Sequence, residues 1–150
     1  MRLEEAREMA EILMTAHGLD TWRFRFDHAR TRVGVCRYDE KVIGLSKYYV
    51  QANDAEEVRG TILHEIAHAL AGPAAGHGAK WKAIARKLVA PTERCTRADT
   101  GVDPKYTLWC TRCGKRIRDY HRKPRRNYDS GRFRHATCGG SRFRLTDYRG

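Results

Sequence analysis

Hydrophobic and polar residues follow two different patterns along the first fifty residues. Residues 3–17 place apolar side chains at helical spacing between glutamates, which predicts an amphipathic helix. The segment 21–26 alternates aromatic and basic residues, which predicts a half-buried strand. The apolar runs 32–37 and 42–46 predict two more short strands, with residues 39–41 as the turn between them. We therefore expect a helix followed by a small antiparallel sheet.

The strongest helical pattern lies between Asp54 and Gly72. Asp54, with Glu57 three residues later, has the form of a capping box that begins a helix. Gly72 is followed by a proline, and this pair predicts where the helix ends. Apolar residues recur between these limits at intervals of four: Val58, Ile62, Ile66 and Leu70.

The rest of the chain begins with a further helix and then changes character. Residues 81–88 repeat the amphipathic pattern and predict a shorter helix. Residues 90–105 contain two prolines and a glycine among polar residues, which is typical of a linker. We expect an α+β protein in which helices pack on a small antiparallel sheet and a small β domain follows. The two expected domains are residues 1–100 and 105–150.

Positive charge is concentrated in the second of these domains. The chain has a formal net charge of +12. Residues 1–100 contribute 16 Lys and Arg against 14 Asp and Glu, whereas residues 101–150 contribute 14 against 4. A near-neutral first part and a strongly basic second part favour contact of the second part with a polyanion such as nucleic acid. A basic face that only keeps the chain in solution is the alternative.

The composition argues against a membrane or secreted protein. Charged residues make up 32% of the chain, and its apolar runs are far shorter than a bilayer span. Residues 1–17 carry four glutamates, unlike a signal peptide. We expect a cytoplasmic monomer, associated with the nucleoid or DNA and not secreted. In such a reducing compartment the five cysteines indicate metal ligands or free thiols rather than disulfides.

The helix predicted from Asp54 carries the first candidate chemistry. His64 and His68 are four residues apart, so they project side by side on a helix. Two neutral imidazoles placed in this way can bind one zinc ion, and Glu65 beside the first can reach a water on that metal. This is the HExxH arrangement of zinc hydrolases. Two surface histidines with a solvated glutamate are the plainer alternative.

A third histidine favours the metal interpretation. His77 follows a turn rich in glycine and alanine that lets the chain double back onto the motif helix. It precedes the helix predicted at 81–88, so it lies next to the N-terminal end of that helix. A ligand there completes a site with three histidines and leaves the fourth position of a catalytic zinc ion open for water.

Two motifs of the form ligand-x-x-Cys-Gly occur in the basic domain. Their glycines fit the tight turns that present sulfur and amide groups to a metal. The runs 116–120 and 142–145, which flank the motifs, alternate as short strands. Together they predict a zinc ribbon that depends on a structural zinc ion for much of its folding energy. Its predicted ligands are Cys110, Cys113, His135 and Cys138, and His121 is the competing fourth ligand.

The other two cysteines have no second cysteine at ligand spacing. Cys36 is most simply a small buried hydrophobic residue. Cys95 lies in the predicted linker and is treated as incidental.

The loop between the two ribbon motifs is basic and carries aromatic residues. Such a loop can hold phosphates and stack a base, although nothing supports sequence-specific recognition. The candidate nucleic-acid contacts are Arg122, Lys123, Arg125, Arg126, Tyr128, Arg132 and Arg134.

Taken together, these motifs resemble the SprT-like family of zinc metalloproteases, which includes the Spartan proteases that act on DNA–protein crosslinks. The resemblance covers nearly the whole chain and rests on residues 64–70, His77-Gly78 with Trp81, and the ribbon cysteines. It implies a zincin-like core with His64, His68 and His77 as zinc ligands and Glu65 as the catalytic carboxylate. Two features depart from the family: the insert between His68 and His77 is short, and His135 stands where a cysteine is usual.

The function expected from the residues and the resemblance is zinc-dependent hydrolysis of peptide bonds. Glu65 acts as general base, and the substrates are proteins associated with DNA or crosslinked to it. Two zinc ions are expected, one catalytic and one structural. A second hydrogen-bond donor to the developing oxyanion would assist the reaction. Tyr48, Tyr49 and Arg59 are the candidates, and the sequence does not select among them.

Two other functions stay open at this point. One is a nucleic-acid-binding adaptor whose HExxH site is structural or idle. The other is a zinc hydrolase that cuts a bond other than a peptide bond, because the motif does not specify the bond.

Overall fold

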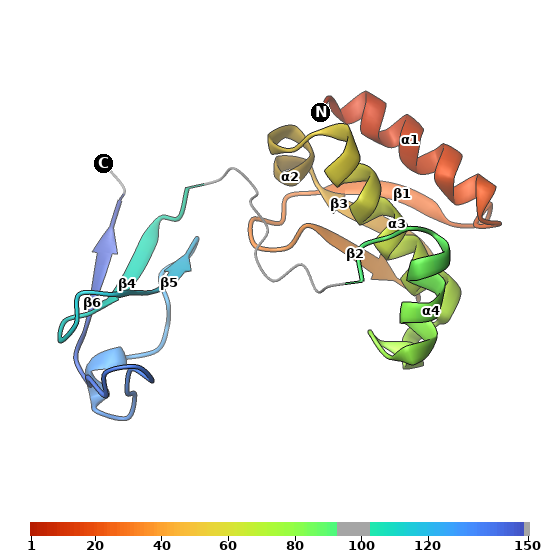
Figure 1. The fold of residues 1–150 in the computed structure, drawn as a ribbon. Coiled ribbons are helices and arrows are strands. Elements are labelled where there is room, and N and C mark those ends of the chain that lie inside the picture. Colours follow the sequence, from red (N-terminus) through yellow and green to blue (C-terminus); the bar gives the residue numbers. More distant parts are fainter. Residues whose placement is uncertain (93–102, 149–150) are drawn as a thin grey trace. The chain divides into compact units, whose positions relative to one another are not determined.

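The computed structural model describes residues 1–92 and 103–148, which divide into two units (Figure 1). Both the mixed α+β class and a second unit compatible with a zinc ribbon agree with the prediction. None of the described helices is long and apolar enough to cross a membrane. The first unit contains α1 (Leu3–Ala16), β1 (Arg23–Asp27), β2 (Gly34–Arg37), β3 (Val42–Ser46), α2 (Lys47–Ala52), α3 (Ala55–Ala71), the 3-10 turn η1 (Pro73–Ala75) and α4 (Ala79–Lys87). The second contains β4 (Tyr106–Cys110), β5 (Arg116–Tyr120), the 3-10 turn η2 (Tyr128–Ser130) and β6 (Phe143–Asp147).

Helix α3 is the central element of the first unit, and it begins and ends where the sequence predicts. The Asp54 carboxylate accepts a hydrogen bond from the Glu57 N–H at 2.9 Å, which caps the first turn. At the other end Gly72 has φ +88°, and its N–H donates to the His68 carbonyl at 3.0 Å. Buried residues occupy most of the helix circumference between these caps, so α3 is surrounded by other elements.

The first sheet differs in one respect from the predicted antiparallel sheet. Strands β2 and β3 pair antiparallel as expected, but β1 pairs parallel to β3, and the strand order is β1-β3-β2. The prediction of a purely antiparallel sheet was therefore wrong. The hairpin of β2 and β3 places β3 in the middle, next to β1 and running in the same direction. Alternation of side chains shows which face of a strand is buried, but it carries no information on strand direction.

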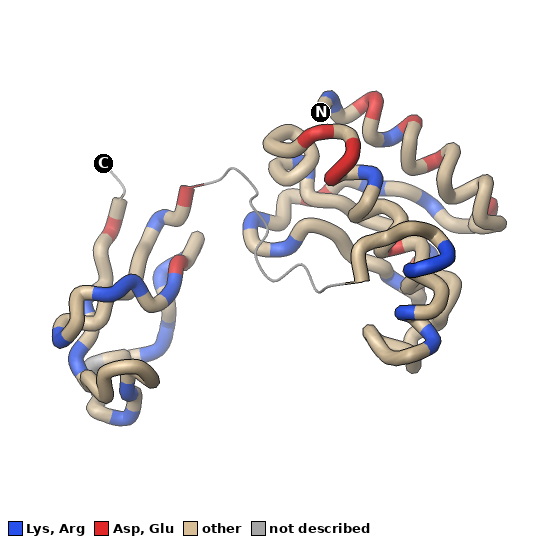
Figure 2. Tube along the Cα trace, viewed as in Figure 1, with Lys and Arg blue, Asp and Glu red and all other residues tan. Residues whose placement is uncertain are grey.

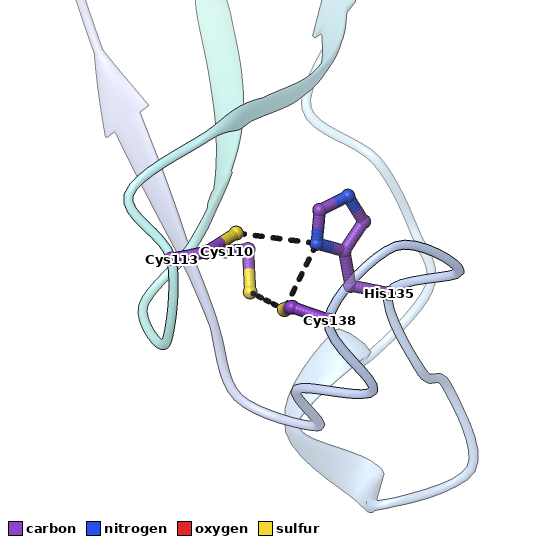
Figure 3. A group of neighbouring side chains, drawn as sticks. All are labelled: Cys110, Cys113, His135 and Cys138. Atoms are coloured by element: carbon purple, nitrogen blue, oxygen red, sulfur yellow. Dashed lines mark hydrogen bonds between the residues drawn. The ribbon is translucent and has the colours of Figure 1, made fainter.

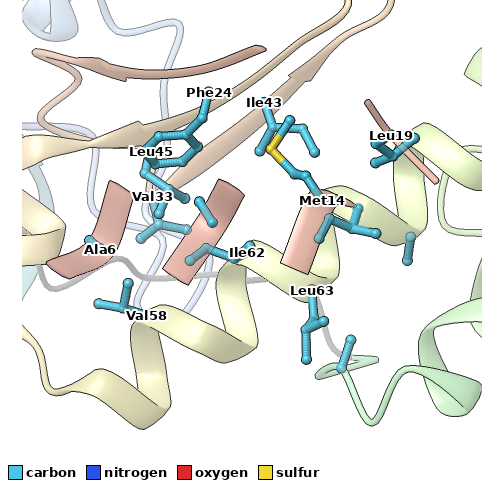
Figure 4. Close-up of a cluster of buried hydrophobic side chains, with 14 of the residues drawn as sticks. Ala6, Met14, Leu19, Phe24, Val33, Ile43, Leu45, Val58, Ile62 and Leu63 are labelled. Atoms are coloured by element: carbon cyan, nitrogen blue, oxygen red, sulfur yellow. The ribbon is translucent and has the colours of Figure 1, made fainter. Parts of the chain in front are cut away.

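The core of this unit lies between the sheet, α1 and α3. Figure 4 shows side chains from the strands and from both helices gathered in one cluster. Because α3 packs against β2 and β3 as well as against α1 and α4, the core fixes the rotation of α3 about its own axis. The cluster includes Ala6 and Met14 of α1, Phe24, Ile43 and Leu45 of the sheet, and Val58, Ile62, Leu63 and Ile66 of α3.

The short helix α2 was not predicted from the sequence. Ser46 caps it, because its hydroxyl accepts from the Tyr49 N–H at 3.4 Å and donates to the Ala29 carbonyl at 2.6 Å. Tyr49 itself is buried, and its hydroxyl lies 2.9 Å from the Thr61 hydroxyl of α3. Tyr49 therefore ties α2 to α3.

The second unit is a three-stranded antiparallel sheet of order β5-β4-β6. Lysines and arginines occur along much of its chain (Figure 2). Its fully buried apolar cluster is small and contains Leu108, Cys110 and Phe143. A core of this size cannot stabilise a separate unit of fewer than fifty residues, so an additional crosslink is required.

Helix α4 ends in a Schellman motif that has an unusual residue at its left-handed position. The N–H of Ala90 donates to the Ala85 carbonyl at 2.8 Å, and the N–H of Val89 donates to the Arg86 carbonyl at 3.1 Å. Val89 has φ +55° and is 82% exposed. A β-branched side chain is strained in this conformation, and Val89 gains no burial in return.

We expect Val89→Gly to raise the free energy of unfolding of the first unit by about 0.5–1 kcal/mol, because relief of strain exceeds the added freedom of the unfolded chain. Thermal denaturation measures the change. The control is Ile12→Gly, which replaces an exposed β-branched residue inside α1 and should lower stability by about 0.5 kcal/mol. A lower melting temperature for Val89→Gly would contradict this account of the α4 terminus.

Candidate functional site

Three histidine side chains from two segments meet beside α3. His64 and His68 project from the same side of α3, and His77 lies between η1 and α4. The Nε2 atom of His77 is 3.2 Å from Nε2 of His64 and 3.1 Å from Nε2 of His68. The turn between α3 and α4 brings His77 back to the helix, and Gly72 and Gly76 permit it with φ values of +88° and +48°.

The spacing of these nitrogen atoms fits zinc. Tetrahedral zinc with Zn–N bonds of 2.0–2.1 Å requires ligand nitrogens about 3.3 Å apart. The observed separations of 3.1 and 3.2 Å are close to this value. Three neutral imidazoles whose Nε2 atoms face one point can satisfy one another only if one Nε2–H is shared between two lone pairs, whereas a cation at that point binds all three lone pairs. The residues present therefore fit a zinc ion.

The surroundings of the three rings hold them in this orientation. Nδ1 of His64 lies 3.2 Å from the carbonyl oxygen of Pro91, which places the ring proton on Nδ1 and leaves the Nε2 lone pair directed at the other rings. The fully buried indole of Trp81 packs against all three imidazoles, with ring centroids 4.6–5.0 Å apart. Trp81, which begins the amphipathic pattern of the second predicted helix, thus also packs against the three candidate ligands.

Burial shifts the pKa values of two of the histidines toward the neutral form. It lowers the pKa of His64, and it lowers the pKa of His68 to about 4 with further contributions from the neighbouring imidazoles. Neutral imidazole is the form that binds metal. The first unit therefore holds these ligands in the binding-competent state at neutral pH.

Glu65 is buried and lines the same cleft of about 660 Å³ as the three histidines. Burial raises the pKa of its carboxyl group to about 8, and the positive charge of Arg32 opposes this shift. Burial alone therefore favours the protonated carboxyl group, and a cation held by the nearby histidines would favour the carboxylate that can accept a proton.

The cleft also contains polar residues that the sequence did not single out. Tyr38 lines it, and the Tyr38 hydroxyl donates to the His68 carbonyl at 3.1 Å. Burial raises the pKa of Tyr38 to about 12, so its hydroxyl stays a donor. Arg32 lines it as well and bonds to the Asp27 carboxylate at 2.6 Å. Both lie near β2, about thirty residues before the motif, and no spacing rule connects them to it.

The residues that the sequence offered as oxyanion donors lie elsewhere. Tyr48, Tyr49 and Arg59 are not among the residues that line the cleft. Tyr49 packs between α2 and α3, and Arg59 borders a separate cavity near Pro91. Cys36, expected to be a buried hydrophobic residue, is half-buried and lines the cleft, and burial raises the pKa of its thiol to about 12.

The second group of candidate ligands lies in the β4–β6 unit (Figure 3). The sulfur of Cys110 is 3.5 Å from that of Cys138, and Nδ1 of His135 is 3.3 Å from the sulfur of Cys113 and 3.1 Å from that of Cys138. All four ligand atoms lie within 4.8 Å of one another, which fits one zinc ion. The structure brings His135 rather than His121 into this group.

Glycines shape this second group as the motifs predict. Gly114 and Gly139 have φ values of +67° and +68°, so both motifs make the tight turn that glycine permits. At Gly140 a Cβ would lie 2.9 Å from the Cys110 sulfur, and therefore glycine leaves room for the ligands. Backbone hydrogen bonds from Cys113 and Arg112 lower the pKa of the Cys110 thiol, which favours the thiolate that binds metal.

The candidate nucleic-acid residues separate into two kinds. Tyr128 is half-buried, its hydroxyl contacts that of Tyr120, and its ring packs against Phe133 at 5.1 Å between centroids. This aromatic ring belongs to the packing of the unit, which argues against base stacking by Tyr128. The basic residues Arg122, Lys123, Arg125, Arg126, Arg132 and Arg134 are exposed.

Comparison with known proteins gives one match. Residues 5–107 match the model of the SprT-like family, which is more than half of the chain. The match covers both histidine segments and ends before the first ribbon ligand, Cys110. No curated protein and no solved structure matches the chain.

We expect the purified protein to contain two equivalents of zinc and Cys110→Ser to contain one, because serine at this position removes a ribbon ligand. Elemental analysis after gel filtration measures the metal. His77→Ala should also leave one equivalent, now in the ribbon. The control is Cys36→Ser, which alters a thiol outside both groups and should keep two. Two equivalents in Cys110→Ser would contradict the ribbon assignment.

Proposed function

Since this chain belongs to the SprT-like family, we propose that it is a zinc-dependent metalloprotease that hydrolyses proteins associated with DNA. The observation that carries the proposal is the convergence of His64, His68 and His77 at Nε2 separations of 3.1–3.2 Å, with the Glu65 carboxyl group in the same cleft. Three histidines are a ligand set that leaves a zinc ion one open position, which distinguishes a catalytic site from a closed structural one.

The residues of the cleft divide the reaction between them. A zinc ion, when bound, supplies Lewis acidity that activates water and polarises the scissile carbonyl group. Glu65 accepts the proton of the attacking water and returns it to the leaving amine. Arg32 lines the cleft, and its Nη1 has no hydrogen-bond partner among the described residues, so it replaces Tyr48, Tyr49 and Arg59 as the candidate donor to the carbonyl oxygen. The Tyr38 hydroxyl proton is already donated to the His68 carbonyl.

The central test is Glu65→Gln. Glutamine keeps the shape of the side chain but cannot accept a proton, so we expect casein hydrolysis to fall by about 10²–10⁴-fold. Zinc content and melting temperature should stay at least as high as in the wild type. The readouts are peptide release and elemental analysis. Unchanged biological function of this variant would favour the adaptor alternative, and a wild type that hydrolyses only non-protein substrates would favour a different zinc hydrolase.

The DNA part of the proposal rests on the second unit. Its exposed loop arginines and lysine supply phosphate contacts without sequence recognition. A further basic and aromatic surface lies on the sheet: Trp109 of β4 pairs in register with Arg116 of β5 and Arg144 of β6. Side chains of directly paired residues share one face, so Trp109, Arg116 and Arg144 lie on one face of the sheet, where the Arg116 guanidinium is ion-paired with Asp119. Such a face suits a single-stranded backbone with unstacked bases.

We expect DNA to stimulate cleavage of DNA-bound proteins such as histones, because the second unit brings the protease and its substrate onto one strand. The variant Arg116→Glu with Arg144→Glu should lose most of this stimulation while it keeps casein hydrolysis. The matched control is Lys82→Glu with Arg86→Glu on α4, which makes the same change of charge in the first unit. Equal rates of histone cleavage with and without DNA would count against the DNA part of the proposal.

A further inference from the structure

Gly34 is the first residue of β2, which lies at an edge of the first sheet. It pairs with Leu45 of β3 and lines the same cleft as Glu65. Gly34 is not among the glycines with positive φ, so its backbone conformation is open to any residue. Conformational freedom therefore does not explain a glycine here, and the explanation must lie in the space beside it.

That space is occupied by the carboxyl group of Glu65. A Cβ atom at position 34 would lie 2.6 Å from Oε1 of Glu65, 3.0 Å from Cγ and 3.1 Å from Cδ. These separations are shorter than van der Waals contact, so a methyl group and the carboxyl group cannot both occupy their places. Helix α3 holds Glu65 from one side, and the bare backbone of β2 holds it from the other.

The conflict would fall on the end of a flexible side chain and not on the backbone. An alanine at position 34 would displace the buried Glu65 side chain, which lowers stability even where the strand and the helix stay in place. Without that conflict, alanine restricts the unfolded chain more than glycine does, which favours the folded state. Glycine at this position is therefore unfavourable for stability in itself, and its benefit is the placement of the carboxyl group.

We propose that Gly34 is a positioning residue that fixes the Glu65 carboxyl group in the cleft by leaving it room against the edge strand. The inference rests on the proposed function, since the placement matters for catalysis only if Glu65 transfers protons. A displacement of about 1 Å of a reacting group can lower a rate by about 10²-fold, so the small shift that one methyl group imposes is sufficient.

The test compares Gly34→Ala with Gly44→Ala in the full-length, zinc-loaded protein. At Gly44 a Cβ would lie 2.9 Å from Cγ1 of Val35, which is also shorter than van der Waals contact, and Glu65 is not among the atoms that it would meet. We expect kcat for casein to fall at least about 10-fold in Gly34→Ala with KM and zinc content unchanged. Gly44→Ala should keep the wild-type kcat. A wild-type kcat in Gly34→Ala, or loss of zinc from it, would overturn the proposal.

A second measurement tests the contact without any enzymatic activity. Gly34→Ala is introduced into the wild type and into Glu65→Ala, where the opposing carboxyl group is gone, and melting temperatures are compared. We expect Gly34→Ala to lower the melting temperature in the wild type and to leave it unchanged or raise it in Glu65→Ala. The two shifts should differ by about 4 °C or more.

The two measurements separate the inference from the proposed function. If the wild type hydrolyses no protein but the two temperature shifts differ, the proposed function fails and the contact stands. If the shifts are equal in both backgrounds, the positioning role is excluded whatever the activity. Should Gly34→Ala fail to fold, recovery of folding in the double variant supports the proposal and continued misfolding contradicts it.

Discussion

The constraint on which this structure depends is that three imidazole nitrogens from two segments must meet at one point. The four-residue spacing of His64 and His68 along α3 brings two of these nitrogens together. The chain must make a tight turn after α3 to bring the third, on His77, back to the helix. Gly72 and Gly76 make that turn with backbone angles that other residues avoid. The Trp81 indole packs against all three rings, and the Pro91 carbonyl fixes the tautomer of His64.

The same packing that holds the candidate ligands also shifts the pKa values of His64, His68 and Glu65. Burial keeps His64 and His68 neutral, and it raises the pKa of the Glu65 carboxyl group to about 8. Both effects come from the placement of α3 in the centre of the first unit, covered by α1, the sheet and α4. The second unit reaches stability by another route, since its small apolar cluster is supplemented by a group of ligands that fits a metal.

Local signals in the sequence predicted the parts of the fold that are themselves local. The Asp54 cap, the Gly72 stop and the spacing of the histidines each depend on residues within one or two turns, and the structure has α3 in these limits. The parallel pairing of β1 with β3 was not predictable from alternation, because direction depends on the path of the chain between the strands. For the same reason Tyr38 was missed: only the placement of β2 against α3 brings it to the cleft.

The protease proposal requires that His64, His68 and His77 share one zinc ion. Diffraction from crystals of the zinc-loaded protein, collected on both sides of the zinc absorption edge, locates zinc directly. We expect an anomalous peak about 2.0–2.1 Å from Nε2 of each of the three histidines, and a second peak among the ribbon cysteines and His135. A peak bound by a different set of side chains, or a His77 ring turned away from the other two, would contradict the proposal.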